Sequence, residues 1–175
     1  ANAWTRSAVA RKRRAPACNL PMNDPGCRLV HDAPLANTFG IDARAGRLHE
    51  VTKIDALPDA LQDAGRDALL IGSGSNLLLV SPAIDCVVQP LDARIELVAD
   101  DGERVRVRAA AGANWHAFVM HALGEGWSGL ENLALIPGTV GASPIQNIGA
   151  YGVEVMDLIE AVQVHDRATG ETRWW

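Results

Sequence analysis

Two glycine-rich stretches hold the residues whose types and spacing could do chemistry. The first is GSGSN, residues 72–76, which follows a short apolar run. Glycine lets a backbone approach a ligand closely, and successive main-chain N–H groups in such a turn can bind an anion. Ser73, Ser75 and Asn76 add side-chain donors, so phosphate is the natural occupant. The stretch matches neither a P-loop nor a Rossmann fingerprint, and taken alone it more often marks an ordinary tight turn.

The second stretch, residues 132–154, is mostly apolar although it is rich in glycine and proline, and its single charge is Glu154. Surface loops of that kind are usually polar. Backbone N–H and C=O groups that are buried without partners cost free energy. We therefore expect the side chains to face the core and the backbone to face a large, flat polar ligand. The alternative is a buried structural loop, which is uncommon at this length.

The composition is that of one folded domain or two small ones, since 48% of the 175 residues are hydrophobic and 21% are charged. No apolar run approaches the length of a membrane span. The formal net charge of −5 argues against a general nucleic-acid binder. Residues 1–21 contain five basic residues and no acidic one. We expect a poorly packed tail there, outside the functional domain, rather than a nucleic-acid or targeting patch.

Cysteine and histidine spacing indicates no metal site. The three cysteines form no CxxC pair, and the five histidines are scattered. His116 and His121 lie five residues apart, whereas two ligands on one helical face lie four apart. No apolar segment follows the basic N-terminal residues, which argues against a secretory signal peptide. We expect a reducing compartment, the cytoplasm.

The hydrophobic pattern predicts an α+β protein with short strands and few helices. Two helices are expected, at residues 58–65 and 115–124. Residues 27–48 are expected to be irregular. The expected strands are residues 68–71, 86–89, 95–98, 105–109, 158–165 and 172–175, and the third and fourth form a hairpin around an Asp-Gly turn.

The second helix carries the clearest pattern, because its apolar residues recur at helical spacing. Asn114 can cap its start and Gly124 its end. Trp115 could stack on a flavin, but its place in the apolar stripe favours the core. His116 and His121 flank the stripe and are expected to face solvent. The stripe is Trp115, Phe118, Val119, Ala122 and Leu123.

Four segments occur in the same order in one enzyme family: NTFGID at 37–42, IGSGSNLLL at 71–79, AGANWH at 111–116 and the long motif at 129–154. The chain from residue 37 onward resembles UDP-N-acetylenolpyruvoylglucosamine reductases, also called UDP-N-acetylmuramate dehydrogenases. The long motif is specific, whereas GSGSN alone is not. The resemblance implies FAD and a PCMH-type, or vanillyl-alcohol-oxidase-like, fold.

In that fold two small α+β subdomains hold the flavin, here residues 22–91 and 92–175. The resemblance puts the pyrophosphate at the first glycine stretch and the flavin along the second, with Tyr151 near the substrate. The implied FAD contacts are Gly72, Ser73, Gly74, Ser75, Asn76, Leu77, Pro137, Gly138, Thr139, Val140, Gly141, Ala142, Ser143, Gln146, Asn147 and Gly149.

The implied activity is a two-step reduction in peptidoglycan precursor synthesis. NADPH reduces the flavin, and the enolpyruvyl ether of a UDP-sugar then accepts the hydride and a proton to give UDP-N-acetylmuramate. In the family the chain continues past the segment that resembles this one into a substrate-binding domain. The family's Tyr-Arg motif comes shortly after the position of Trp175, and its serine proton donor and catalytic glutamate lie further on. We therefore expect an FAD-binding portion that is inactive alone. The alternatives are another PCMH-type FAD oxidoreductase, or a non-catalytic flavin- or nucleotide-binding module.

Overall fold

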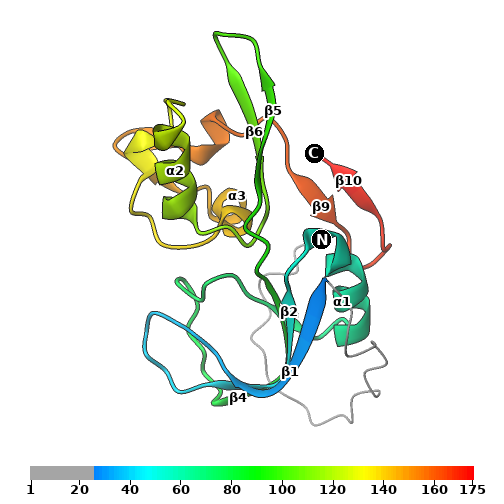
Figure 1. The fold of residues 1–175 in the computed structure, drawn as a ribbon. Helices are drawn as coiled ribbons and strands as arrows, with labels where there is room; N and C mark the ends of the chain where they lie inside the picture. The colour runs from blue at the N-terminus through cyan, green and yellow to red at the C-terminus, as the bar shows by residue number, and fades with distance from the viewer. Residues whose placement is uncertain (1–25) are drawn as a thin grey trace.

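The structure is a computed structural model and describes residues 26–175 (Figure 1). The N-terminal part of this range forms a four-stranded mixed sheet. The expectation for residues 1–21 lies outside this range. The strand order is β1 (Cys27–Pro34), β2 (Arg44–Val51), β4 (Ala83–Pro90) and β3 (Leu69–Leu70). β1 pairs antiparallel with β2, while β4 runs parallel to both β2 and β3.

The expectation that residues 27–48 are irregular is wrong, because they contain all of β1 and more than half of β2. Their apolar positions are partly alanines, such as the buried Ala33 and Ala45, and they alternate with charged residues. Such a strand shows no continuous apolar run. Its stability comes from pairing and packing that are not local in sequence.

The expected first helix is confirmed as α1 (Leu57–Ala64), which follows the short 3₁₀ turn η1 (Ile54–Ala56). Proline lies in its first turn, and Gly65 ends it with a φ of +83°. One face of the sheet packs against α1. The residues of that core are Val51, Ala60, Leu61, Ala64, Ala68, Cys86 and Val88. A second core of the same sheet consists of Ala33, Leu35, Ala43, Ala45, Leu48, Ile71, Leu79 and Val87.

The hairpin and the second helix are also confirmed. β5 (Ile95–Asp100) and β6 (Val105–Ala109) pair antiparallel, and Figure 1 shows them extending away from the first sheet. In α2 (Trp115–Gly124), Asn114 accepts the N-cap bond from the Ala117 N–H at 2.9 Å. Trp115 is buried, and its indole N–H donates to the Leu133 carbonyl at 2.8 Å. The tryptophan therefore belongs to the core, with Val119, Leu133 and Val155.

The two histidines of α2 differ in environment. His121 is exposed, as expected, and its ring meets Trp127 edge to face. His116 was also expected to face solvent, but it is half-buried. Its Nδ1 accepts a hydrogen bond from the Leu135 N–H at 3.2 Å. The ring thus secures the start of the second glycine stretch.

Short elements complete the chain. They are η2 (Glu131–Leu133), η3 (Val140–Ala142), α3 (Ser143–Gln146), β7 (Gly149–Ala150), β8 (Val153–Glu154), η4 (Val155–Asp157), β9 (Gln163–His165) and β10 (Thr172–Trp174). β9 and β10 pair antiparallel. The strand expected from residue 158 begins only at Gln163, because the Leu158 and Ile159 amides donate to the Val155 carbonyl and continue the turn of η4. No helix within residues 26–175 is long and apolar enough to cross a membrane.

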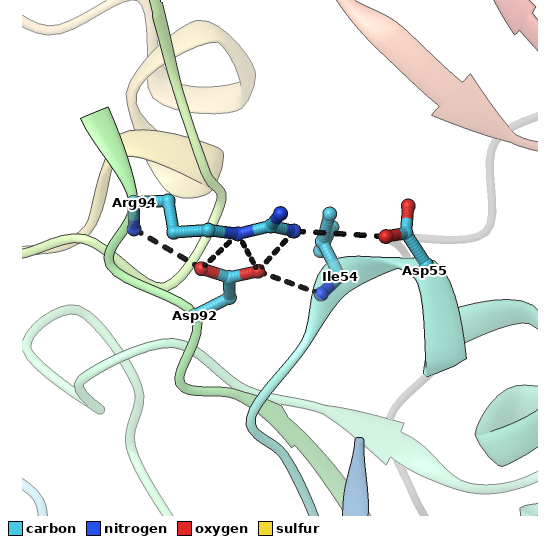
Figure 2. Close-up of polar contacts among 4 residues, drawn as sticks. All are labelled: Ile54, Asp55, Asp92 and Arg94. Atoms are coloured by element: carbon cyan, nitrogen blue, oxygen red, sulfur yellow. Dashed lines mark hydrogen bonds and ion pairs between the residues drawn. The ribbon is translucent and has the colours of Figure 1, made fainter. Parts of the chain in front are cut away.

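A buried carboxylate fastens the connection between the first sheet and β5 (Figure 2). Asp92 is 3% exposed and accepts hydrogen bonds from the Ile54 N–H at 2.8 Å and the Arg94 N–H at 3.0 Å. The Arg94 guanidinium pairs with it at 2.7 Å. Burial opposes ionisation, but the Arg94 side chain and the two amides outweigh it and lower the pKa of Asp92 below its usual value.

Candidate functional site

The two glycine stretches meet in space. A Cβ on Gly72 would lie 2.8 Å from the Thr139 hydroxyl oxygen, and one on Gly138 would lie 3.6 Å from the Ser75 hydroxyl oxygen. Gly138 has a φ of +135°, a conformation that favours glycine. The fold thus brings together the two segments that the sequence marks as binding loops.

One side-chain hydrogen bond crosses between the stretches. The Asn76 amide donates to the Gln146 side-chain oxygen at 3.2 Å, and both residues are exposed. Both were predicted as cofactor contacts. In this structure they bond to each other at the edge of the site.

The first glycine loop begins where β3 leaves the sheet. The Ile71 N–H donates to the Val88 carbonyl at 3.0 Å, and the Gln89 side chain donates to the Gly72 carbonyl at 2.8 Å. Gly74 is buried with a φ of +70°. A Cβ there would collide with the Ala36 carbonyl oxygen, so the tight approach of two backbones requires glycine.

This loop presents donors that nothing in the described part of the chain engages. Within residues 26–175, no hydrogen bond is made by the main-chain N–H groups of Ser73, Gly74, Ser75 and Asn76. The Ser73 hydroxyl is buried and has no hydrogen-bond partner there. An unsatisfied buried polar group costs about 1–3 kcal/mol. Clustered free N–H groups and a buried hydroxyl fit the acceptor oxygens of a phosphate.

The second stretch is fixed from behind by the residues before α2. The Trp115 N–H donates to the Gly138 carbonyl at 3.1 Å, and the Val140 N–H donates to the Ala113 carbonyl at 2.9 Å. Ser143 is buried, and its hydroxyl donates to the Val140 carbonyl at 2.8 Å. A narrow hollow lies along this stretch. It is lined by Trp115, Pro137, Gly138, Thr139, Ala142, Ser143, Gln146 and Ile148.

Asn147 and Tyr151 lie in the segment that follows. The Asn147 amide nitrogen donates to Glu154 at 2.7 Å, and its oxygen accepts from the Met156 N–H at 3.3 Å. The Asn147 side chain therefore makes hydrogen bonds within the segment that includes Gly149 and stabilises its conformation. Tyr151 is 89% exposed and has a φ of +53°, which is uncommon for a residue with a side chain. It does not line the hollow.

The site is electrically neutral in its own side chains. Residues 72–79 and 132–149 contain no Asp, Glu, Lys, Arg or His. Such loops can bind and orient a ligand through main-chain groups and hydroxyls, and they hold no carboxylate, imidazole or ammonium group for proton transfer. In the described part of the chain, no group of His, Cys, Asp or Glu residues is arranged to hold a metal ion.

Sequence reasoning missed two residues that hold the first loop. Gln89 supports Gly72 from β4, and Thr38 contacts the loop from the turn after β1. Nothing in a lone glutamine marks Gln89. Thr38 lies in the NTFGID segment, which the resemblance included but to which it gave no role.

The sequence and fold match a family of flavin-nucleotide-binding domains. Residues 47–175 match the FAD binding domain family, and the chain belongs to that family. The UDP-N-acetylenolpyruvylglucosamine reductase from Thermus caldophilus has a similar fold, with a TM-score of 0.61 and 24% identity over 85% of this chain and 52% of that one.

Two curated relatives bear the name that the resemblance implies. This chain is 51% identical over 147 residues to the UDP-N-acetylenolpyruvoylglucosamine reductase of Xanthomonas campestris pv. campestris strain 8004, covering 81% of this chain and 42% of that protein. It is 49% identical over 140 residues to the enzyme of the same name from Pseudomonas fluorescens strain Pf0-1, covering 78% of this chain and 41% of that protein. The chain therefore spans less than half the length of these relatives.

Proposed function

We propose that the two glycine stretches form one FAD site, and that the chain is the FAD-binding portion of a UDP-N-acetylenolpyruvoylglucosamine reductase. The family membership and the relatives support the assignment. The observation that carries it is the cluster of free N–H groups with the buried Ser73 hydroxyl, set against the hollow of the second stretch. A dinucleotide has a phosphate portion that the free N–H groups of the first loop can bind and a flat ring that can lie along the backbone of the second stretch.

The residues divide the work between them. In the proposal, the Ser73 hydroxyl and the main-chain N–H groups of residues 73–76 bind the pyrophosphate, and residues 137–143 contact the flavin ring. Gln146 and Asn76 close one edge of the site through their mutual bond. The exposed Tyr151 is available to the substrate rather than to the cofactor.

The proposed reaction is reduction of UDP-N-acetylenolpyruvoylglucosamine to UDP-N-acetylmuramate for peptidoglycan synthesis, in the cytoplasm, with NADPH as the hydride donor. FAD supplies the hydride chemistry, and these loops orient it and limit its contact with water. No Asp, Glu, Lys, Arg or His lies in residues 72–79 or 132–149, so in the proposal the proton comes from a donor outside these residues. Another PCMH-type oxidoreductase is the weaker candidate, since relatives that are half identical bear the reductase name.

Purification of the 175-residue chain tests the cofactor assignment. The protein should carry flavin absorbance, and heat denaturation should release FAD rather than FMN. A colourless protein that also takes up no added FAD contradicts the proposal. Bound FMN in place of FAD contradicts a dinucleotide site, because the first loop would then hold a single phosphate and no pyrophosphate.

A further inference from the structure

The segment Asn37–Asp42 contacts the first glycine loop through Thr38. The Thr38 hydroxyl donates to the Ser75 carbonyl at 3.0 Å, and the Thr38 N–H donates to the Gly74 carbonyl at 3.4 Å. Two adjacent carbonyls of the loop are thus held by the same residue.

The turn that carries Thr38 is organised by Asn37. The Asn37 side-chain oxygen accepts from the Ile41 N–H at 3.0 Å, and its nitrogen donates to the Ile41 carbonyl at 2.8 Å and the Leu35 carbonyl at 3.2 Å. These bonds use the full reach of the amide within the turn. The turn that carries Thr38 therefore has a defined conformation.

Because of peptide geometry, the contact of Thr38 with two carbonyls also sets the direction of two main-chain N–H groups. All peptide bonds among residues 26–175 are trans, so the C=O and N–H of each peptide unit point in opposite directions. The Gly74 carbonyl shares a peptide unit with the Ser75 N–H, and the Ser75 carbonyl shares one with the Asn76 N–H. When Thr38 holds both carbonyls, it directs the Ser75 and Asn76 N–H groups away from the Asn37–Asp42 turn.

We propose that Thr38 is a positioning residue for the pyrophosphate loop. It touches the loop from behind and sets the direction of two N–H donors without itself contacting the cofactor. The close approach of Gly74 to Ala36 permits this, because any side chain at residue 74 would separate the two backbones. The inference rests on the proposed FAD function.

Thr38→Val tests the proposal, because it removes the hydroxyl and keeps the side-chain shape. The Kd for FAD should rise about 2- to 12-fold, the range for one neutral hydrogen bond. The Kd for riboflavin, which has no phosphate, should stay unchanged, while the melting temperature of the apoprotein should fall by a few degrees at most because one neutral hydrogen bond is lost. Thr38→Ser should restore FAD affinity. Thr52→Val, an exposed threonine whose hydroxyl makes no hydrogen bond in the described structure, is the matched control.

A second measurement needs no cofactor. In the apoprotein, the NMR amide signal of Asn76, whose peptide unit carries the Ser75 carbonyl, should shift in Thr38→Val and return in Thr38→Ser. The Ser75 signal should change less, because the residue 38 N–H still donates to the Gly74 carbonyl. Unchanged FAD affinity or unchanged amide signals in Thr38→Val overturns the positioning role while leaving the FAD proposal intact. Equal weakening of FAD and riboflavin shows a general disturbance of the fold and also overturns it. If wild-type protein binds no FAD, the proposed function fails and the NMR comparison still decides how Thr38 acts on the loop.

Discussion

Replacement of Asp92 should destabilise the chain more than any other change of an acidic side chain outside the binding loops. Its carboxylate is 3% exposed and receives the Ile54 N–H, the Arg94 N–H and the Arg94 guanidinium (Figure 2). Asp92→Ala leaves two main-chain donors without this acceptor and removes the nearer of the two carboxylate partners of Arg94, the other being Asp55 at 3.7 Å. Because the Arg94 side chain is half exposed, its share is reduced by solvent.

The magnitude follows from the two amide bonds. Hydrogen bonds to charged groups contribute about 1.5–3 kcal/mol each, and rehydration of the freed groups returns part of this. We expect Asp92→Ala to lower the free energy of unfolding by about 2–4 kcal/mol. Asp92→Asn should lose less than Asp92→Ala, because its one side-chain oxygen can still accept from one of the two N–H groups, which bond to different oxygens of Asp92.

Urea unfolding followed by tryptophan fluorescence measures the loss at pH 7. Asp59→Asn is the control, since Asp59 is exposed on α1. The lowered pKa means that Asp92 stabilises the fold above pH about 4 and that this contribution disappears as pH falls through its folded-state pKa. A loss of stability in Asp92→Ala no larger than that of Asp59→Asn would refute the reasoning.

Three further predictions concern His49, Gly138 and the reaction. His49 is fully buried with Asp63 at 3.7 Å, and burial chiefly lowers its pKa against the opposing effect of Asp63. As pH falls, the unfolded chain is therefore protonated at this histidine before the folded chain is, so the free energy of unfolding should decrease below pH about 6.5. His49→Leu should reduce this pH dependence, measured by urea unfolding at several pH values. An equally steep pH dependence in His49→Leu contradicts the prediction. Gly138→Val should lower the free energy of unfolding of the apoprotein by roughly 1–3 kcal/mol, because valine is strained at positive φ. It should also abolish the rise in melting temperature that added FAD produces. A rise equal to that of wild type would contradict a ligand-binding role for this stretch. The FAD-loaded 175-residue chain should form no UDP-N-acetylmuramate from the enolpyruvyl substrate and NADPH beside an active full-length relative; product formation at the relative's rate would place the proton donor within these residues.

The features that the sequence predicted well are those encoded over short distances. The stripe around Trp115 and the alternation in β6 need only a few neighbouring residues to be recognised. β1 and β2 were missed because small and charged residues alternate in them, and their stability depends on each other and on β4.

The candidate site divides in the same way. Glycine and proline content marked both stretches, but only the fold shows that Gly72 meets Thr139. Polar residue type could not show that the Asn147 side chain is occupied within its own segment. The role of Thr38 depends on which carbonyls it reaches, and that is a tertiary property.

Ser73→Ala, titrated with FAD and with riboflavin, tests most directly whether the first stretch holds the pyrophosphate of a flavin on the second. The Ser73 hydroxyl is buried without a partner, so its removal should leave the apoprotein as stable as wild type or more stable. It should raise the Kd for FAD by about 10- to 100-fold, the range for a hydrogen bond to a charged acceptor, and leave the Kd for riboflavin unchanged. An unchanged Kd for FAD, or an equal loss of affinity for both ligands, would contradict a single FAD site built from the two glycine stretches.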